Sequence, residues 1–93
     1  MTHKIKILEQ FARAVLSGDK TFELRENNRG YQKGDMLHFV PIDKLGVRSS
    51  DIDEFEAIVT YVLAGWGLKE GYVALGIKLT SGERRETDDG NLL

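Results

Sequence analysis

One amphipathic helix stands out in a chain whose other apolar residues mostly alternate with polar ones. An apolar stripe with spacings of three and four residues predicts this helix, at Leu8, Phe11, Ala12, Val15 and Leu16. Gly18 follows the stripe, and a glycine ends a helix readily because it adopts positive φ at little cost. Because a doubly wound α/β fold needs helices between its strands, a single short helix argues against that fold.

Five other segments show the period-two alternation of β-strands. The predicted strands cover residues 3–8, 21–26, 36–40, 54–63 and 72–79, and we expect Pro41 to end the third of them. Residues 42–53 have no clear period and are predicted to be a loop. Five strands and one main α-helix after the first strand indicate an α+β, mostly β fold. We expect a small, strongly curved sheet or five-stranded β-barrel with the helix at one end.

The length of 93 residues fits one domain with a single core, which we place at residues 1–80. Residues 81–93 are polar and charged, and we expect them to form a flexible C-terminal tail. The chain has no cysteine, which excludes disulfides, thiolate metal sites and cysteine nucleophiles. It has neither an apolar run that could span a membrane nor the apolar segment of a signal peptide, so we expect a cytoplasmic protein with no membrane partner.

The net charge of −2 argues against a strong, non-specific attraction to nucleic acid. The charges are unevenly distributed, because basic residues outnumber acidic ones only as far as Asp35. A basic face is therefore expected only on the first part of the chain.

Most of the reactive chemistry lies in residues 18–35. After the predicted helix, Lys20 is followed by Glu23 and Arg25, which share one face of the second strand. Arg25 offers a planar fork of donors, Lys20 a movable positive charge, and Glu23 an acceptor. An acceptor beside two cationic donors suits a nucleobase that carries phosphate, or a modified nucleoside. The alternative is an ion-pair network on a solvated surface.

Four further residues are candidates for ligand binding. Arg29 and Tyr31 could add a guanidinium and an aromatic platform, or could bond loop carbonyls and pack over the barrel mouth. Trp66, between two glycines, is expected either to be displayed over the site or to cap the core. His3 could titrate near neutrality or be a hydrogen-bonded structural histidine. His38 is expected on the exposed face of its strand, and two histidines so far apart predict neither a metal site nor a cofactor.

The segment Gly18-x-Lys20-x-x-Glu23-x-Arg25 resembles the GxKxxExR signature of ASCH domains, which belong to the PUA-like barrel superfamily. From His3 to Lys78 the chain is similar to a small ASCH/PUA-like family of unknown function, DUF3850. Further motifs that carry this similarity are Asn27-Asn28-Arg29-x-Tyr31-x-x-Gly34-Asp35 and Gly71-Tyr72-Val73. ASCH domains are generally thought to bind RNA or nucleotides. The resemblance therefore implies a PUA-like barrel that holds RNA, a nucleotide or a modified nucleoside at the GxKxxExR cleft.

The resemblance also raises an enzymatic alternative. Some small ASCH proteins are amidohydrolases that deacetylate N4-acetylcytidine with a lysine, a threonine and a glutamate. Their lysine corresponds to Lys20, but their threonine corresponds to Glu23, and the segment that supplies their glutamate is longer than residues 42–53 or 64–71. If the chain is an enzyme, Lys20 and Glu23 are its candidate catalytic residues. A third hypothesis is a protein-interaction module of phage or mobile-element origin that uses the acidic residues 51–56.

Overall fold

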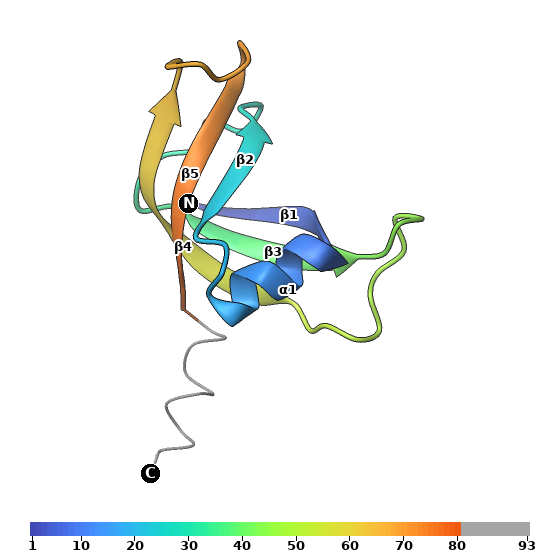
Figure 1. Cartoon of the computed structure of the whole chain (residues 1–93). Helices are drawn as coiled ribbons and strands as arrows, with labels where there is room; N and C mark the ends of the chain where they lie inside the picture. Colours follow the sequence, from blue (N-terminus) through green and yellow to red (C-terminus); the bar gives the residue numbers. More distant parts are fainter. Residues whose placement is uncertain (81–93) are drawn as a thin grey trace.

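The computed structural model describes residues 1–80 (Figure 1). Its elements are, in order, β1 (Thr2–Leu8), α1 (Glu9–Ser17), β2 (Phe22–Glu26), β3 (Met36–Ile42), β4 (Phe55–Ala64) and β5 (Tyr72–Leu79). The predicted tail, residues 81–93, lies outside the described residues. The sole helix among residues 1–80 is neither long nor apolar enough to cross a membrane.

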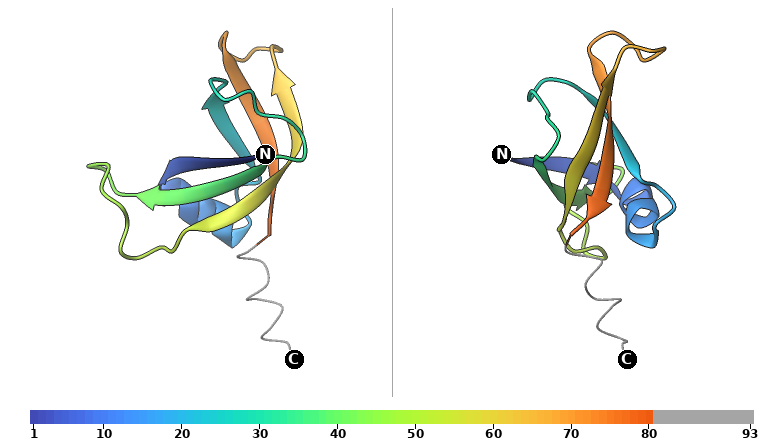
Figure 2. Two further views of the ribbon diagram at one scale, coloured as in Figure 1. Left: turned by 180° about the vertical axis from the view of Figure 1, so that it is seen from behind. Right: turned by 90° about the vertical axis from the view of Figure 1, so that its left-hand side faces the viewer.

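All five strands belong to one sheet, in the order β1-β3-β4-β5-β2. The pair β1–β3 is parallel and the other three pairs are antiparallel. The strand β4 pairs with β3 over residues 55–58 and with β5 over residues 57–64, and its bend curls the sheet into a half-barrel (Figure 2). A register shift between Val59 and Tyr61 marks a bulge within β4, a feature that increases local bending and twist. The expected mostly β fold, with one helix after the first strand, is confirmed.

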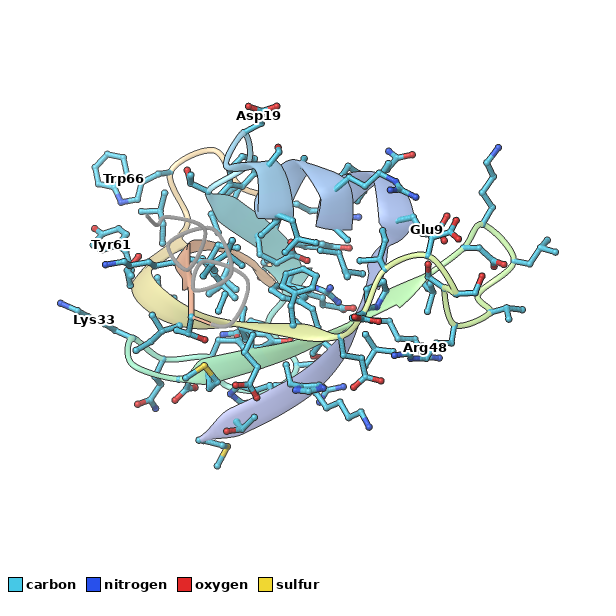
Figure 3. All side chains as sticks on the ribbon, turned by 90° about the horizontal axis from the view of Figure 1, so that it is seen from below. Glu9, Asp19, Lys33, Arg48, Tyr61 and Trp66 are labelled. Carbon is cyan, nitrogen blue, oxygen red and sulfur yellow. The ribbon has the colours of Figure 1, made fainter. Side chains whose placement is uncertain are left out.

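The core fills the space between α1 and the concave face of the sheet. In the view from below, α1 lies on the opposite side of the packed side chains from β1 and β3 (Figure 3). The helix contributes Ala12 and Val15 to this core, and the strands contribute fully buried residues such as Leu37, Phe39 and Leu75. Burying a side chain of this size stabilises the fold by roughly 2 kcal/mol relative to leaving it exposed. Packing on the sheet therefore holds a helix of nine residues that would be marginal alone.

The way in which α1 ends fixes the position of Lys20 at the start of the next segment. Gly18 adopts φ 91° and its N–H donates to the carbonyl oxygen of Val15 at 3.1 Å. The N–H of Lys20 then donates to the carbonyl oxygen of Ala14 at 3.0 Å. These two bonds tie the turn to the last helical residues, so that Lys20 lies at the entrance to β2. The predicted helix end at Gly18 is confirmed.

The prediction that Pro41 ends the third strand is wrong, because β3 continues to Ile42. Pro41 pairs with Ile7 of β1 and is fully buried, while the ladder with β4 ends at Phe39. The carbonyl oxygen of Pro41 accepts from Ser49, on the side away from β1. The N–H that proline lacks would point to that same side, so its absence costs no bond to β1.

Candidate functional site

The structure brings Lys20, Glu23 and Arg25 into direct contact. The Glu23 carboxylate lies 2.8 Å from Lys20 Nζ through Oε1 and 2.7 Å from Arg25 Nε through Oε2. The Glu23 side chain is only 7% exposed, and those of Lys20 and Arg25 are 16% and 24% exposed. The three side chains therefore form an ion-pair network that is largely shielded from solvent, and we call this cluster the triad.

The triad lies at one edge of the half-barrel because β2 turns its charged face inward. Glu23 is opposite Leu75 and Arg25 is opposite Val73, both buried residues of β5. The alternate residues of β2, Phe22 and Leu24, are half exposed. Among residues 1–80, β1 and β2 are the two strands with only one neighbour. Arg25 bridges them, since its Nη2 donates to the carbonyl oxygen of Lys6 in β1. We call this line between β1 and β2 the seam.

The triad keeps hydrogen-bonding capacity for a ligand. Lys20 Nζ donates to Glu23 and, at 2.8 Å, to the carbonyl oxygen of Phe22, which uses two of its three N–H groups. Arg25 uses two of its five N–H groups, on Glu23 and Lys6. Each oxygen of the Glu23 carboxylate has a further lone pair. The triad can therefore donate to a ligand and accept from it at adjacent positions.

A cleft of about 500 Å³, which we call the apolar cleft, opens beside the triad. Its wall includes Phe11 and Phe22, which are 41% and 50% exposed. Lys20 Nζ lies 5.4 Å and 4.9 Å from the centres of these two rings. The full lining comes from β1, α1, β2 and the end of β3: Lys6, Ile7, Leu8, Phe11, Lys20, Phe22, Glu23, Leu24, Arg25, Glu26 and Ile42. Phe11 and Phe22 were not among the sequence-predicted site residues, because aromatic residues on an apolar stripe or an alternating strand ordinarily indicate core.

A second cleft, of about 460 Å³, contains two more of the predicted residues, Arg29 and Tyr31. We call it the polar cleft. Its lining is Lys4, Ile5, Lys6, Arg25, Glu26, Asn28, Arg29 and Tyr31. Arg29 is exposed, whereas Tyr31 is buried, as expected for a ring that packs over the barrel mouth.

His3 is buried and lies outside the described lining of both clefts. Its Nε2 donates to Asp35 Oδ2 at 2.8 Å, and its ring makes an edge contact with Tyr31 at a centroid distance of 4.8 Å. Asp35 also accepts from the backbone N–H of Gln32 at 3.0 Å. The hydrogen bond from His3 lowers the pKa of Asp35 below its ordinary value, against a smaller opposing effect of burial. The contact between Asp35 and His3 was not predicted from the sequence, where Asp35 stands out only as part of a motif.

Trp66 is placed away from the triad. It is 90% exposed with φ 53°, in the turn between β4 and β5, and it lines neither cleft. Its side chain points outward in Figure 3, so the expectation that it caps the core is wrong.

His38 contacts two carboxylates, which was not expected for a residue on the exposed face of a strand. Its Nε2 lies 2.5 Å from Glu54 Oε1 and its Nδ1 lies 3.1 Å from Glu56 Oε2. These two carboxylates raise the pKa of His38, with Glu54 the larger cause. In return, His38 and then Arg48 lower the pKa of Glu54. Within the described part of the chain, no group of three or more histidine, aspartate or glutamate residues is arranged to hold a metal ion.

A family model described as "Domain of unknown function (DUF3850)" matches residues 2–77. No curated protein matches the chain significantly. The family match spans β1 to β5 and includes the triad and both clefts. The relation to ASCH domains stays a prediction from the sequence. The chain belongs to the DUF3850 family.

Proposed function

We propose that this protein is an RNA- or nucleotide-binding module of the ASCH/PUA-like type, and that it holds a nucleobase in the apolar cleft. The observation that carries this proposal is the position of the triad in the wall of a cleft that also exposes two phenylalanine rings. Neither feature alone would suffice. Aromatic rings without the triad would fit any apolar ligand, and the triad without the rings would fit any small polar one.

The chemistry of a nucleobase matches both features. Stacking a base on an aromatic side chain contributes roughly 1–3 kcal/mol whatever the base, and Phe11 and Phe22 are exposed enough to offer ring faces. The edge of a base carries donors beside acceptors, which the remaining N–H groups of Lys20 and Arg25 and the lone pairs of Glu23 complement. Glutamate accepts well from an exocyclic amino group, so we expect cytosine or guanine to bind better than uracil.

The same contacts favour binding over the amidohydrolase alternative. Lys20 already donates to Glu23 and to the carbonyl oxygen of Phe22, which is the role of a positioned cation. A carboxylate also stands where those enzymes have a threonine. For the acidic residues 51–56, no contact described above indicates a particular protein partner.

The test is an NMR titration of ¹⁵N-labelled protein with each of the four nucleoside monophosphates and with a short single-stranded RNA. We expect amide shifts in β2 and at the start of α1, and we expect Phe11→Ala to weaken binding by about tenfold, the loss of one stacked ring. Trp66→Ala is the matched control, since it removes an exposed aromatic ring that lines neither cleft. Absence of shifts with every ligand would refute the proposal, as would equal weakening by the two variants. Turnover of an N4-acylated cytidine that Lys20→Ala abolishes would instead favour the enzyme.

A further inference from the structure

Two cationic side chains at the polar cleft have no ion-pair partner in the described part of the chain. The side chains of Lys6 and Arg29 form no ion pair or hydrogen bond within residues 1–80, and both are exposed at the cleft. Arg25 adds a third cation, which is shared with Glu23. Among the described lining residues, Glu26 is the single acidic one. Lys4 also lines the cleft, but its charge acts partly on Glu54, whose pKa it helps to lower.

The backbone of β1 adds donors to the same cleft. The carbonyl group of Lys6 faces the seam, because it accepts from Arg25 across it. The N–H and C=O groups of one strand residue point to the same side, and the side alternates along the strand, so the N–H groups of Lys4 and Lys6 also face the seam. In the described sheet β1 has no strand on that side. Unpaired N–H groups along a concave sheet edge are a recurrent way of binding anions.

The two clefts adjoin each other along the seam. The apolar cleft follows β1 from Lys6 to Leu8, and the polar cleft follows it from Lys4 to Lys6. The clefts share Lys6, Arg25 and Glu26, so groups of one ligand bound in the two clefts would lie on either side of Arg25. A nucleotide has this pattern, with a flat apolar part joined to an anion.

We propose that the polar cleft is a phosphate-binding subsite, in which Lys6, Arg29 and the edge N–H groups of β1 bind the phosphate of the nucleotide whose base lies in the apolar cleft. This inference rests on the proposed function and narrows it. The ligand is a phosphate ester, as a free nucleotide or as part of a single strand, and not a free base or nucleoside. The triad itself is a poor phosphate site, because Glu23 would repel the anion.

The experiment compares three ligands with the same base: cytidine, cytidine monophosphate and a six-nucleotide cytidine strand. We expect the monophosphate to bind more tightly than cytidine, with an affinity that falls as salt rises. Arg29→Gln should weaken the monophosphate roughly fivefold, as for an exposed ion pair near 1 kcal/mol, and leave cytidine unchanged, because Arg29 lines only the polar cleft. Lys6→Gln should weaken the monophosphate by a similar factor, but Lys6 lines both clefts, so only Arg29→Gln isolates the phosphate. Lys33→Gln is the matched control, because it removes an exposed lysine that lines neither cleft (Figure 3). Tighter binding of the strand than of the monophosphate would identify RNA as the source of the phosphate.

The outcomes separate this inference from the function on which it rests. Equal affinity for cytidine and its monophosphate, or equal effects of Arg29→Gln and Lys33→Gln, would overturn the phosphate subsite and leave the base site standing. If no nucleoside or nucleotide binds, inorganic phosphate decides the matter. Shifts of the Lys4–Lys6 and Arg29 amides with phosphate alone would support the anion site without the base site, and no shifts would overturn both.

Discussion

Replacing Glu23 with glutamine tests whether the triad is an integral part of the fold. The substitution keeps the shape of the side chain and removes the negative charge between Lys20 and Arg25. A glutamine has one oxygen and one NH₂ group at its end, so it can accept from either cation but turns donors toward the other. One charge-assisted hydrogen bond is therefore lost outright, and the second becomes weaker.

The magnitude follows from the burial of the three groups. A hydrogen bond to a charged group contributes about 1.5–3 kcal/mol, and loss of a partner from a fully buried pair costs about 3–5 kcal/mol. Water reaches Lys20 and Arg25 in part, at 16% and 24% exposure, and offsets some of this cost. We expect Glu23→Gln to lower the free energy of unfolding by about 2 kcal/mol. A solvent-screened surface pair would give less than about 1 kcal/mol.

Urea unfolding followed by circular dichroism at pH 7 measures this difference, and thermal unfolding should show a fall in Tm of about 8–16 °C for a domain of this size. The matched control is Glu26→Gln, an exposed carboxylate on the same strand, for which we expect no measurable change. A loss below 1 kcal/mol for Glu23→Gln, or similar losses for the two variants, would show that the triad is screened like a surface network and would refute the reasoning.

Three further predictions concern the end of the helix at Gly18 and the contacts of Asp35 and His38. Gly18→Ala should cost about 1–2 kcal/mol in urea unfolding, since a Cβ there meets open space and the cost is that of φ 91° alone; no loss would contradict this. The lowered pKa of Asp35 means that its stabilisation is complete above an unfolded pKa near 3.8 and disappears as the pH falls to the lower folded pKa. Asp35→Asn should therefore flatten the acid side of the stability profile, and an unchanged profile would contradict this. The raised pKa of His38 gives the opposite dependence of stability on pH. The stabilisation from His38 is complete below about pH 6.5 and is lost as the pH rises through the folded pKa. His38→Gln should abolish that decline, which a persistent decline above pH 6.5 would contradict.

The spacing of hydrophobic residues along the chain was sufficient to predict the five strands and the helix of this fold. Each strand and the helix were located within about two residues, because alternation and the three-four spacing reflect which side chains face the core. The exception is Pro41, where the sequence does not reveal that the missing N–H would point away from β1. The 81–93 tail stays a prediction.

The sequence did not predict which face of β2 is buried. Its alternation is regular, and the ordinary reading of such a strand would bury Phe22 and Leu24. The structure buries Glu23 instead, because Lys20 and Arg25 supply partners that satisfy the carboxylate inside the edge of the half-barrel. Whether a buried charge has partners depends on three-dimensional contacts, such as the bond from Arg25 to Lys6 across the seam.

The pairs that sequence reasoning missed join residues far apart along the chain. His3 meets Asp35 because β1 and β3 are parallel in a register that places Thr2 beside Met36. His38 meets Glu56 because the two are direct partners in the antiparallel register of β3 and β4. Strand order and register are set by the tertiary fold, so neither pair could be read from the local pattern.

The lysines of β1 have a competing explanation that bears on the phosphate subsite. Charged residues on an edge strand also prevent it from pairing with the edge of another molecule, and Lys4 and Lys6 lie on such an edge. This role predicts that Lys6→Gln increases self-association, with no change in affinity for a phosphate ester. Arg29 separates the two explanations, because it lies outside the strands, where edge protection gives it no purpose. A selective loss of monophosphate binding in Arg29→Gln would therefore support phosphate binding independently of what Lys6 does for solubility.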